Sequence, residues 1–335
     1  MNNFKHKGYI IALLLFTVAF FLSSSPAVTE AARALFQPAE SRPVSGELSG
    51  ETGSGSDTAA PDPNGSGMPQ RDPDGVPEGT AATVPVLMYH AFTAGSYAPS
   101  DLYVTQARFR QQLQALQSAG YSFVTCKDLQ NFVSRGTPLP QNPILLTCDD
   151  GYLDNYLYAY PVLQELNARM TIFTVGISIG KDTYRDTSQA INPHFSFAQA
   201  AEMSTSGLVE IGSHTYDMHR WPALETGEAR HGMEPLSSET KETYLPFAES
   251  DLRYMYQQLS LVPGSNRTIL AYPQGANHPW AQEAAANCGM TLTCTTQKGT
   301  NTLVVGDPNT LLNLNRYTVT DDLTGGKLLQ LLTVQ

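Results

Sequence analysis

Positive charge is scarce in this chain of 335 residues. Lys and Arg together number 20, against 31 Asp and Glu, and the formal net charge is −11 at pH 7. Proteins that bind nucleic acid neutralise its phosphates with clustered Lys and Arg side chains. The acidic balance therefore argues against nucleic acid as a partner.

Cysteines and long hydrophobic runs are also few. The four cysteines, at positions 126, 148, 288 and 294, allow disulfides after export, but their spacing does not give a pairing. The sequence His-Glu-x-x-His is absent, which argues against a metallopeptidase. The largely apolar stretch from Tyr9 to Leu22 is shorter than the roughly 20 residues of a membrane-spanning helix.

The first 36 residues are typical of an export signal. Lys5 and Lys7 precede the apolar stretch, and small residues follow it. We expect a secreted or cell-surface protein, and a retained segment that anchors the chain to the membrane stays open as an alternative to cleavage. Residues 37–83 are rich in Gly, Ser, Pro and acidic residues, which predicts a disordered linker. The folded domain is expected at residues 84–335.

Within that domain, strand-like apolar segments alternate with segments of helical periodicity. The strands are expected at residues 84–90, 121–125, 144–148, 170–175, 209–211, 268–272 and 290–295, and the main helices at 109–119, 156–167, 197–204, 251–261 and 280–287. Such alternation predicts an α/β fold with a parallel sheet or barrel. We expect a distorted (β/α) barrel of about seven strands in a single domain, with residues 215–250 forming a long loop near the site.

Two adjacent carboxylates, Asp149 and Asp150, follow the apolar run at residues 143–146. Adjacent side chains at the end of a strand point in different directions, so one carboxylate can bind a cation while the other transfers a proton. Asp-Asp-Gly is also favourable turn chemistry, which is the structural alternative.

A second apolar run, residues 208–211, is followed by His214 and His219. Two imidazoles and the carboxylate of Asp150 would bind a divalent metal and leave positions open for water and substrate. These residues lie at predicted C-terminal ends of strands, where barrel enzymes place their active sites.

Three segments resemble the main motifs of the polysaccharide deacetylases, the NodB-homology carbohydrate esterases of family 4. They are Thr147-Cys148-Asp149-Asp150-Gly151, residues 214–219, and Tyr272-Pro273-Gln274-Gly275. The resemblance covers about residues 84–335 and implies the NodB-homology barrel. It also implies a metal-dependent hydrolase that removes N-acetyl groups from amino-sugar polymers such as peptidoglycan or poly-N-acetylglucosamine. By the same resemblance Asp149 is the general base, and Asp150, His214 and His219 hold the metal, most often Zn2+.

The sequence departs from the family pattern at several points. His214 and His219 are five residues apart instead of four, which resembles the poly-N-acetylglucosamine deacetylase branch. Ala271 stands where an Arg usually opens the third motif, and Gln274 replaces an aromatic residue. Another residue must then orient Asp149, and Arg316 is the candidate.

The family's late His, the usual general acid, has no equivalent, since no His follows His278. His90 is the candidate replacement, because it ends a strand that resembles the N-terminal Tyr-His strand of the same branch. A hydrogen-bonded core residue is the alternative for His90.

Substrate binding or orientation is expected from a further set of residues, Tyr152, Tyr272, Pro273 and Gln274. Trp221 could also stack on a sugar ring, although aromatic side chains in loops often pack in the core. The expected partner is an N-acetylated polysaccharide or oligosaccharide bound by a monomer. A carbohydrate-binding protein that kept the fold and lost turnover is the alternative function.

Overall fold

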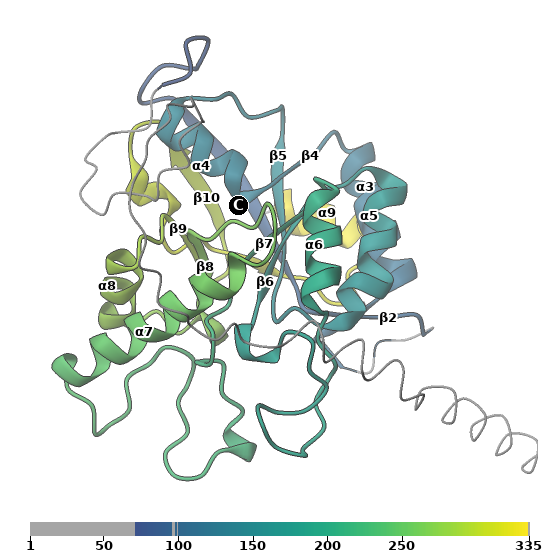
Figure 1. Cartoon of the computed structure of the whole chain (residues 1–335). Coiled ribbons are helices and arrows are strands. Elements are labelled where there is room, and N and C mark those ends of the chain that lie inside the picture. The colour runs from purple at the N-terminus through teal and green to yellow at the C-terminus, as the bar shows by residue number, and fades with distance from the viewer. Residues whose placement is uncertain (1–70, 96–97, 99, 334–335) are drawn as a thin grey trace, which may run out of the picture. The chain divides into compact units, whose positions relative to one another are not determined.

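A computed structural model describes residues 71–95, 98 and 100–333, all within the unit Ser66–Gln335 (Figure 1). The expected export signal at residues 1–36 and residues 37–70 of the expected linker lie outside the described residues. In the ranges that are described, no helix has both the length and the apolar character needed to cross a bilayer.

One curled sheet of nine strands organises the domain. Seven strands follow one another in the order β10-β1-β5-β6-β7-β8-β9, while β4 pairs with β5 and β11 pairs with β1. The strands are β1 (Ala81–Tyr89), β4 (Ser122–Val124), β5 (Pro143–Cys148), β6 (Met170–Thr174), β7 (Val209–Ser213), β8 (Ile269–Ala271), β9 (Leu292–Cys294), β10 (Thr300–Val304) and β11 (Tyr317–Thr318). Only the β1–β10 pair of this sheet is antiparallel among the described strand pairs. The predicted distorted (β/α) barrel is confirmed.

The chain between Leu314 and Val319 connects the two sides of the curled sheet. Leu314 forms a parallel bridge with Cys294 of β9, and Tyr317 pairs with Leu87 of β1. The segment therefore places Arg316 between the last parallel strand and the first.

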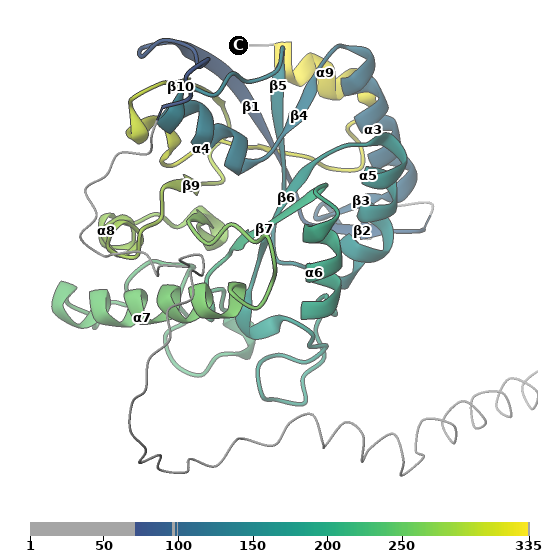
Figure 2. The same cartoon turned by 45° about the horizontal axis from the view of Figure 1, so that its top comes forward.

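Helices cover the outside of the sheet. They are α3 (Gln106–Ser118), α4 (Cys126–Arg135), α5 (Tyr160–Leu166), α6 (Phe197–Thr205), α7 (Lys241–Leu259), α8 (Pro279–Asn287) and α9 (Gly325–Thr333). Figure 2 shows α3, α5 and α9 gathered on one side of the sheet, and α7 beside α8 on another. A separate parallel pair, β2 (Ala91–Thr93) and β3 (Tyr103–Thr105), follows β1. The sequence patterns did not indicate β2, β3, β10, β11 or α9.

Helix α7 begins ten residues before the predicted helix at 251–261, so the expectation of a loop up to residue 250 is wrong for its last part. Thr240 and Thr243 form reciprocal capping contacts at the start of the helix. Its buried apolar positions recur at helical spacing: Tyr244, Ala248, Leu252, Met255 and Leu259. Pro246, in the second turn, obscures this pattern in the sequence because proline usually ends a helix.

The predicted boundary at residue 84 is also too late, since residues 71–83 belong to the folded domain. β1 starts at Ala81, and the preceding segment bonds through its backbone to the domain. The amides of Asp72 and Val76 donate to the carbonyls of Arg135 and Gly136 at 2.9 and 2.8 Å. Composition does not reveal such a segment because backbone groups make these bonds.

Strand periodicity decides which side chains face the interior of the curl. Val84 and Val86 of β1 pack in one cluster with Leu145 of β5 and with residues of β6, β8 and β9, and none of these last three strands pairs with β1. Leu87 and Tyr89 pack in another cluster, against α3, α5, α6 and α9. His90 and Asp149 continue the interior-facing alternation beyond the ends of β1 and β5. All four cysteines are described, and each is a free thiol.

Candidate active site

A pocket of about 390 Å³ lies at the C-terminal ends of β1, β5 and β7. Its lining includes most of the residues proposed from the sequence: His90, Asp149, Asp150, Tyr152, His214, His219, Trp221 and Gln274. The structure therefore brings together side chains that follow four different strands.

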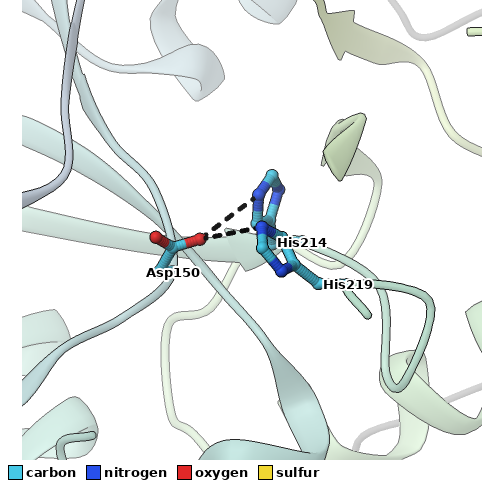
Figure 3. Close-up of side chains that lie close together, drawn as sticks. All are labelled: Asp150, His214 and His219. Atoms are coloured by element: carbon cyan, nitrogen blue, oxygen red, sulfur yellow. Dashed lines mark ion pairs between the residues drawn. The ribbon is translucent and has the colours of Figure 1, made fainter. Parts of the chain in front are cut away.

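Asp150, His214 and His219 form a cluster of metal-ligand type (Figure 3). The Nε2 atoms of His214 and His219 lie 3.5 and 3.4 Å from Oδ1 of Asp150. This oxygen is buried and has no hydrogen-bond partner. An unpartnered buried carboxylate oxygen facing two imidazole nitrogens fits a divalent metal, because a cation would satisfy all three donor atoms.

The backbone holds His214 in the orientation that a ligand needs. Its Nδ1 lies 2.8 Å from the carbonyl oxygen of Ala271, which assigns the proton to Nδ1 and leaves the Nε2 lone pair toward Asp150. Burial lowers the pKa of His214 to about 4, despite the nearby carboxylate of Asp149. The imidazole is therefore neutral at physiological pH, as metal binding requires.

Left-handed backbone conformations turn the chain toward the site after β5 and after β7. Asp150 has φ 73° and Thr215 has φ 68°. A β-branched residue in this region is strained, and such strain concentrates at functional sites. Gly151, with φ 82°, has no room for a side chain, because a Cβ there would lie 2.2 Å from Oγ1 of Thr174. The turn places Asp150 beside Asp149 in one pocket, although strand alternation alone would separate the two side chains.

Asp149 is bound by Arg316. Nη1 and Nη2 of Arg316 each donate to one carboxylate oxygen at 2.7 Å, and Nε donates to the carbonyl of Thr295 at 2.7 Å. Arg316 is fully buried, and Asp149 nearly so. Burial acts to raise the pKa of Asp149, but Arg316 and His214 outweigh it and hold the pKa well below its usual range. The carboxylate is therefore ionised and fixed in orientation.

His90 lies half-buried at the end of β1, in the pocket. Its carbonyl accepts hydrogen bonds from Nδ2 of Asn155 at 2.8 Å and from the thiol of Cys148 at 3.0 Å. Asn155 begins a π-helical turn, Asn155–Ala159, and such turns often occur at functional sites. The imidazole shares the pocket with Asp149 and Asp150.

The remaining residues proposed from the sequence divide into two groups. Tyr152 contacts the Asp150 carboxylate through its hydroxyl, and Gln274 lines the pocket with φ 58°. Tyr272 and Pro273 do not reach the pocket. Tyr272 is 1% exposed and packs with Met218, Tyr244 and other apolar side chains beneath α7 and α8, so the prediction that it contacts substrate is wrong. Its aromatic ring completes the core because it continues β8.

Several lining residues had no signal in the sequence. They are Leu102, Arg220, Pro222, Ala223 and Thr296. Most of them come from loops without periodicity, and their presence in the pocket follows from how those loops fold over the strand ends.

Comparison with known proteins agrees with this site. Residues 136–293 match the family model described as polysaccharide deacetylase. A Bacillus subtilis protein, YxkH, named as a candidate polysaccharide deacetylase, is 28% identical over 218 residues, which are 65% of this chain and 66% of that protein. A poly-beta-1,6-N-acetyl-D-glucosamine N-deacetylase of Staphylococcus epidermidis is 26% identical over 193 residues, 57% of this chain and 60% of that protein. The chain thus spans just under two thirds of the length of these relatives.

The fold is shared with solved structures. The structure of IcaB from Ammonifex degensii superimposes with a TM-score of 0.58 and 25% sequence identity, covering 78% of this chain and 98% of that one. The family match includes Asp149, Asp150, His214 and His219, the residues that the fold brings together. Residues 136–293, which include these four side chains, therefore belong to the polysaccharide deacetylase family.

Proposed function

We propose that this protein is a metal-dependent polysaccharide deacetylase that hydrolyses N-acetyl groups of amino-sugar polymers. One observation carries the proposal: the Asp150, His214 and His219 cluster shares a pocket with the Asp149–Arg316 ion pair. A metal site beside an ionised, oriented carboxylate is what amide hydrolysis by water requires.

Asp150, His214 and His219 would hold the metal, and Zn2+ suits two imidazoles and a carboxylate. When bound, such an ion lowers the pKa of water and polarises the acetamide carbonyl. Tyr152 would orient Asp150, since its hydroxyl contacts that carboxylate.

Asp149 would accept the proton of the attacking water. Arg316 holds both carboxylate oxygens and so limits the directions in which Asp149 can accept it. The same ion pair lowers the basicity of Asp149. The arrangement therefore favours orientation over proton affinity.

His90 would protonate the departing amine. Expulsion of an unprotonated amine is very unfavourable, so amide hydrolysis needs a proton donor. His90 lines the pocket that also contains both carboxylates. The hydrogen bonds that Cys148 and Asn155 donate to the backbone carbonyl of His90 restrict the position of its Cα. They therefore keep the imidazole at the pocket.

The substrate class follows from the relatives and the rim of the pocket. A relative is named for poly-beta-1,6-N-acetyl-D-glucosamine, and Trp221, 37% exposed, offers a ring surface on which a sugar can stack. Poly-N-acetylglucosamine and peptidoglycan are the proposed polymers. We also propose a monomer located outside the cytoplasm, secreted or held at the cell surface by its N-terminal segment. Cell fractionation and light scattering test these two points.

The alternative function is a carbohydrate-binding protein without turnover. It was suggested by the absence of two residues of the family pattern, the Arg that opens the third motif and the late His. Arg316 contacts Asp149, and His90 lies in the pocket, so side chains for both roles are present from other parts of the chain. This supports the enzyme over the binding protein.

Acetate release tests the proposal. The purified protein is incubated with β-1,6- and β-1,4-linked N-acetylglucosamine oligomers, peptidoglycan and acetylated xylan, with and without added Zn2+. We expect release from an amino-sugar polymer that a chelator abolishes and Zn2+ restores. Saturable binding of the oligomers without any acetate would establish the binding protein instead.

A further inference from the structure

The loop that carries His219 is not part of a helix or strand. His219 follows His214 by five residues, a spacing at which one helical turn cannot place both side chains on one face. The loop begins with Thr215 in a strained left-handed conformation. Interactions outside the loop must therefore maintain the position of His219.

Asp251, from the interior of α7, makes buried side-chain contacts to this loop, in addition to the backbone bonds that the amides of Gly176 and Ile177 donate to the carbonyls of Thr215 and Tyr216. Asp251 is only 9% exposed. Oδ1 accepts the amide of Tyr216 at 2.8 Å, and Oδ2 accepts the amide of Asp217 at 2.7 Å. One carboxylate thus fixes two successive peptide groups, two and three residues before His219.

Other interactions of the loop are nearer to solvent. Asp217 pairs with Arg185 at 2.8 Å and with Arg220 at 3.1 Å, and Arg220 also pairs with Glu225. The charged side chains of this cluster are 16–34% exposed. Ion pairs that solvent reaches contribute little, about 0–1 kcal/mol each. The two hydrogen bonds of Asp251, by contrast, are made by a buried carboxylate.

We propose that Asp251 is a positioning residue for the metal ligand His219. Its carboxylate holds the loop in the conformation that points Nε2 of His219 toward Asp150 before any ion binds. A site arranged in advance loses less conformational entropy on binding, and so it binds metal more tightly. The inference rests on the proposed metal site.

The substitution Asp251→Asn tests this role. The amide keeps the size of the side chain but replaces one acceptor oxygen with a donor that faces a peptide N–H. The Kd for Zn2+ is measured by competition with a chromophoric chelator, and the visible spectrum of the Co2+-loaded protein reports ligand geometry. We expect Zn2+ affinity to fall about tenfold or more, as for substitutions that disturb ligand orientation, together with a changed Co2+ spectrum.

Glu210→Gln is a matched control. Glu210 is 8% exposed and accepts two successive amides, those of Cys126 and Lys127 at 2.9 and 3.1 Å, at the start of α4. It does not line the pocket. We expect this variant to lose thermal stability in chelator as Asp251→Asn does, but to bind Zn2+ with wild-type affinity. Equal affinities in wild type and Asp251→Asn would overturn the inference.

Hydrogen exchange of the wild-type protein gives a test that does not depend on a variant that folds. The amides of Tyr216 and Asp217 should be protected in metal-free protein as strongly as in the Zn2+-loaded form. Protection that arises only on loading would show that the metal orders the loop, and would contradict the inference. Failure of the wild type to bind Zn2+ at all would instead contradict the proposed function.

Discussion

Arg316 binds both carboxylate oxygens of Asp149 at 2.7 Å, although 167 residues separate the two in the sequence. The contact is buried and unscreened by solvent. It depends on the segment between Leu314 and Val319, which pairs with β9 and β1 and carries the guanidinium into the interior. The closure of the barrel and the orientation of Asp149 therefore have the same structural origin.

Replacing Arg316 with Gln should change the pH dependence of acetate release. Without the guanidinium, burial acts with less opposition on Asp149 and raises its pKa. The acidic limb of the kcat/KM profile should then move to higher pH, with a lower maximal rate. An unmoved acidic limb would remove Asp149 from the groups that control that limb.

The same substitution should also destabilise the protein, because it leaves a buried carboxylate unpaired, at a cost of about 3–5 kcal/mol. The double variant Asp149→Asn/Arg316→Gln should recover part of this loss. Urea unfolding of the two variants measures the difference.

Asp149→Asn should retain Zn2+ and lose activity. The amide cannot accept the proton of water, and general-base catalysis contributes roughly 10²–10⁴-fold. Metal content by elemental analysis and acetate release are measured on the same sample. Loss of the metal together with activity would make Asp149 a ligand instead of the base.

His214→Ala should lose most of the bound Zn2+ while the domain stays folded, because His214 supplies one of three ligand atoms. His278→Ala is the control. His278 caps α8 by accepting the amide of Trp280 at 3.2 Å and does not line the pocket. A full equivalent of Zn2+ in His214→Ala protein would show that the ligand assignment is incorrect.

His90→Asn should lose roughly 10²-fold in rate on amide substrates, because general-acid catalysis contributes about 10²–10⁴-fold. Activated esters should lose much less, because their leaving group needs no proton. Equal losses on amide and ester would argue against proton donation, and an unchanged amide rate would leave His90 as a core residue.

Two buried groups near the site predict opposite pH effects on the stability of the metal-free protein. Burial lowers the pKa of His194 to about 4 from 6.5, so its contribution is present above pH 6.5 and is lost as pH falls toward 4. Burial raises the pKa of Asp154 from 3.8 to about 7, so its contribution is present below pH 3.8 and is lost as pH rises through 7.

Urea unfolding between pH 4.5 and 8 tests both assignments. Relative to His194→Gln, the wild type should become less stable as pH falls. Relative to Asp154→Asn, it should become less stable as pH rises. A pH-independent difference for either variant would contradict the corresponding shift.

Local patterns were enough to predict the barrel and the cluster of Asp150, His214 and His219. Strand periodicity and the placement of polar residues directly after strands are short-range features, and parallel strands bring their C-terminal ends to one edge. Asp149, Asp150, His214 and His219 could therefore be proposed together from the sequence, before their distances were known.

Other features depended on contacts between distant parts of the chain. Tyr272 lies in the core and not in the pocket, because α7 and α8 cover that side of β8. Residues 71–80 join the domain through backbone bonds that leave no mark in composition. Asp251 reads in the sequence only as one polar residue in a helix, yet its carboxylate holds the loop of His219. The sequence alone determined which predicted strands are followed by the residues of the site. Only the tertiary structure decided which buried charged side chains contact those residues, because a buried charge requires a partner that local periodicity does not specify.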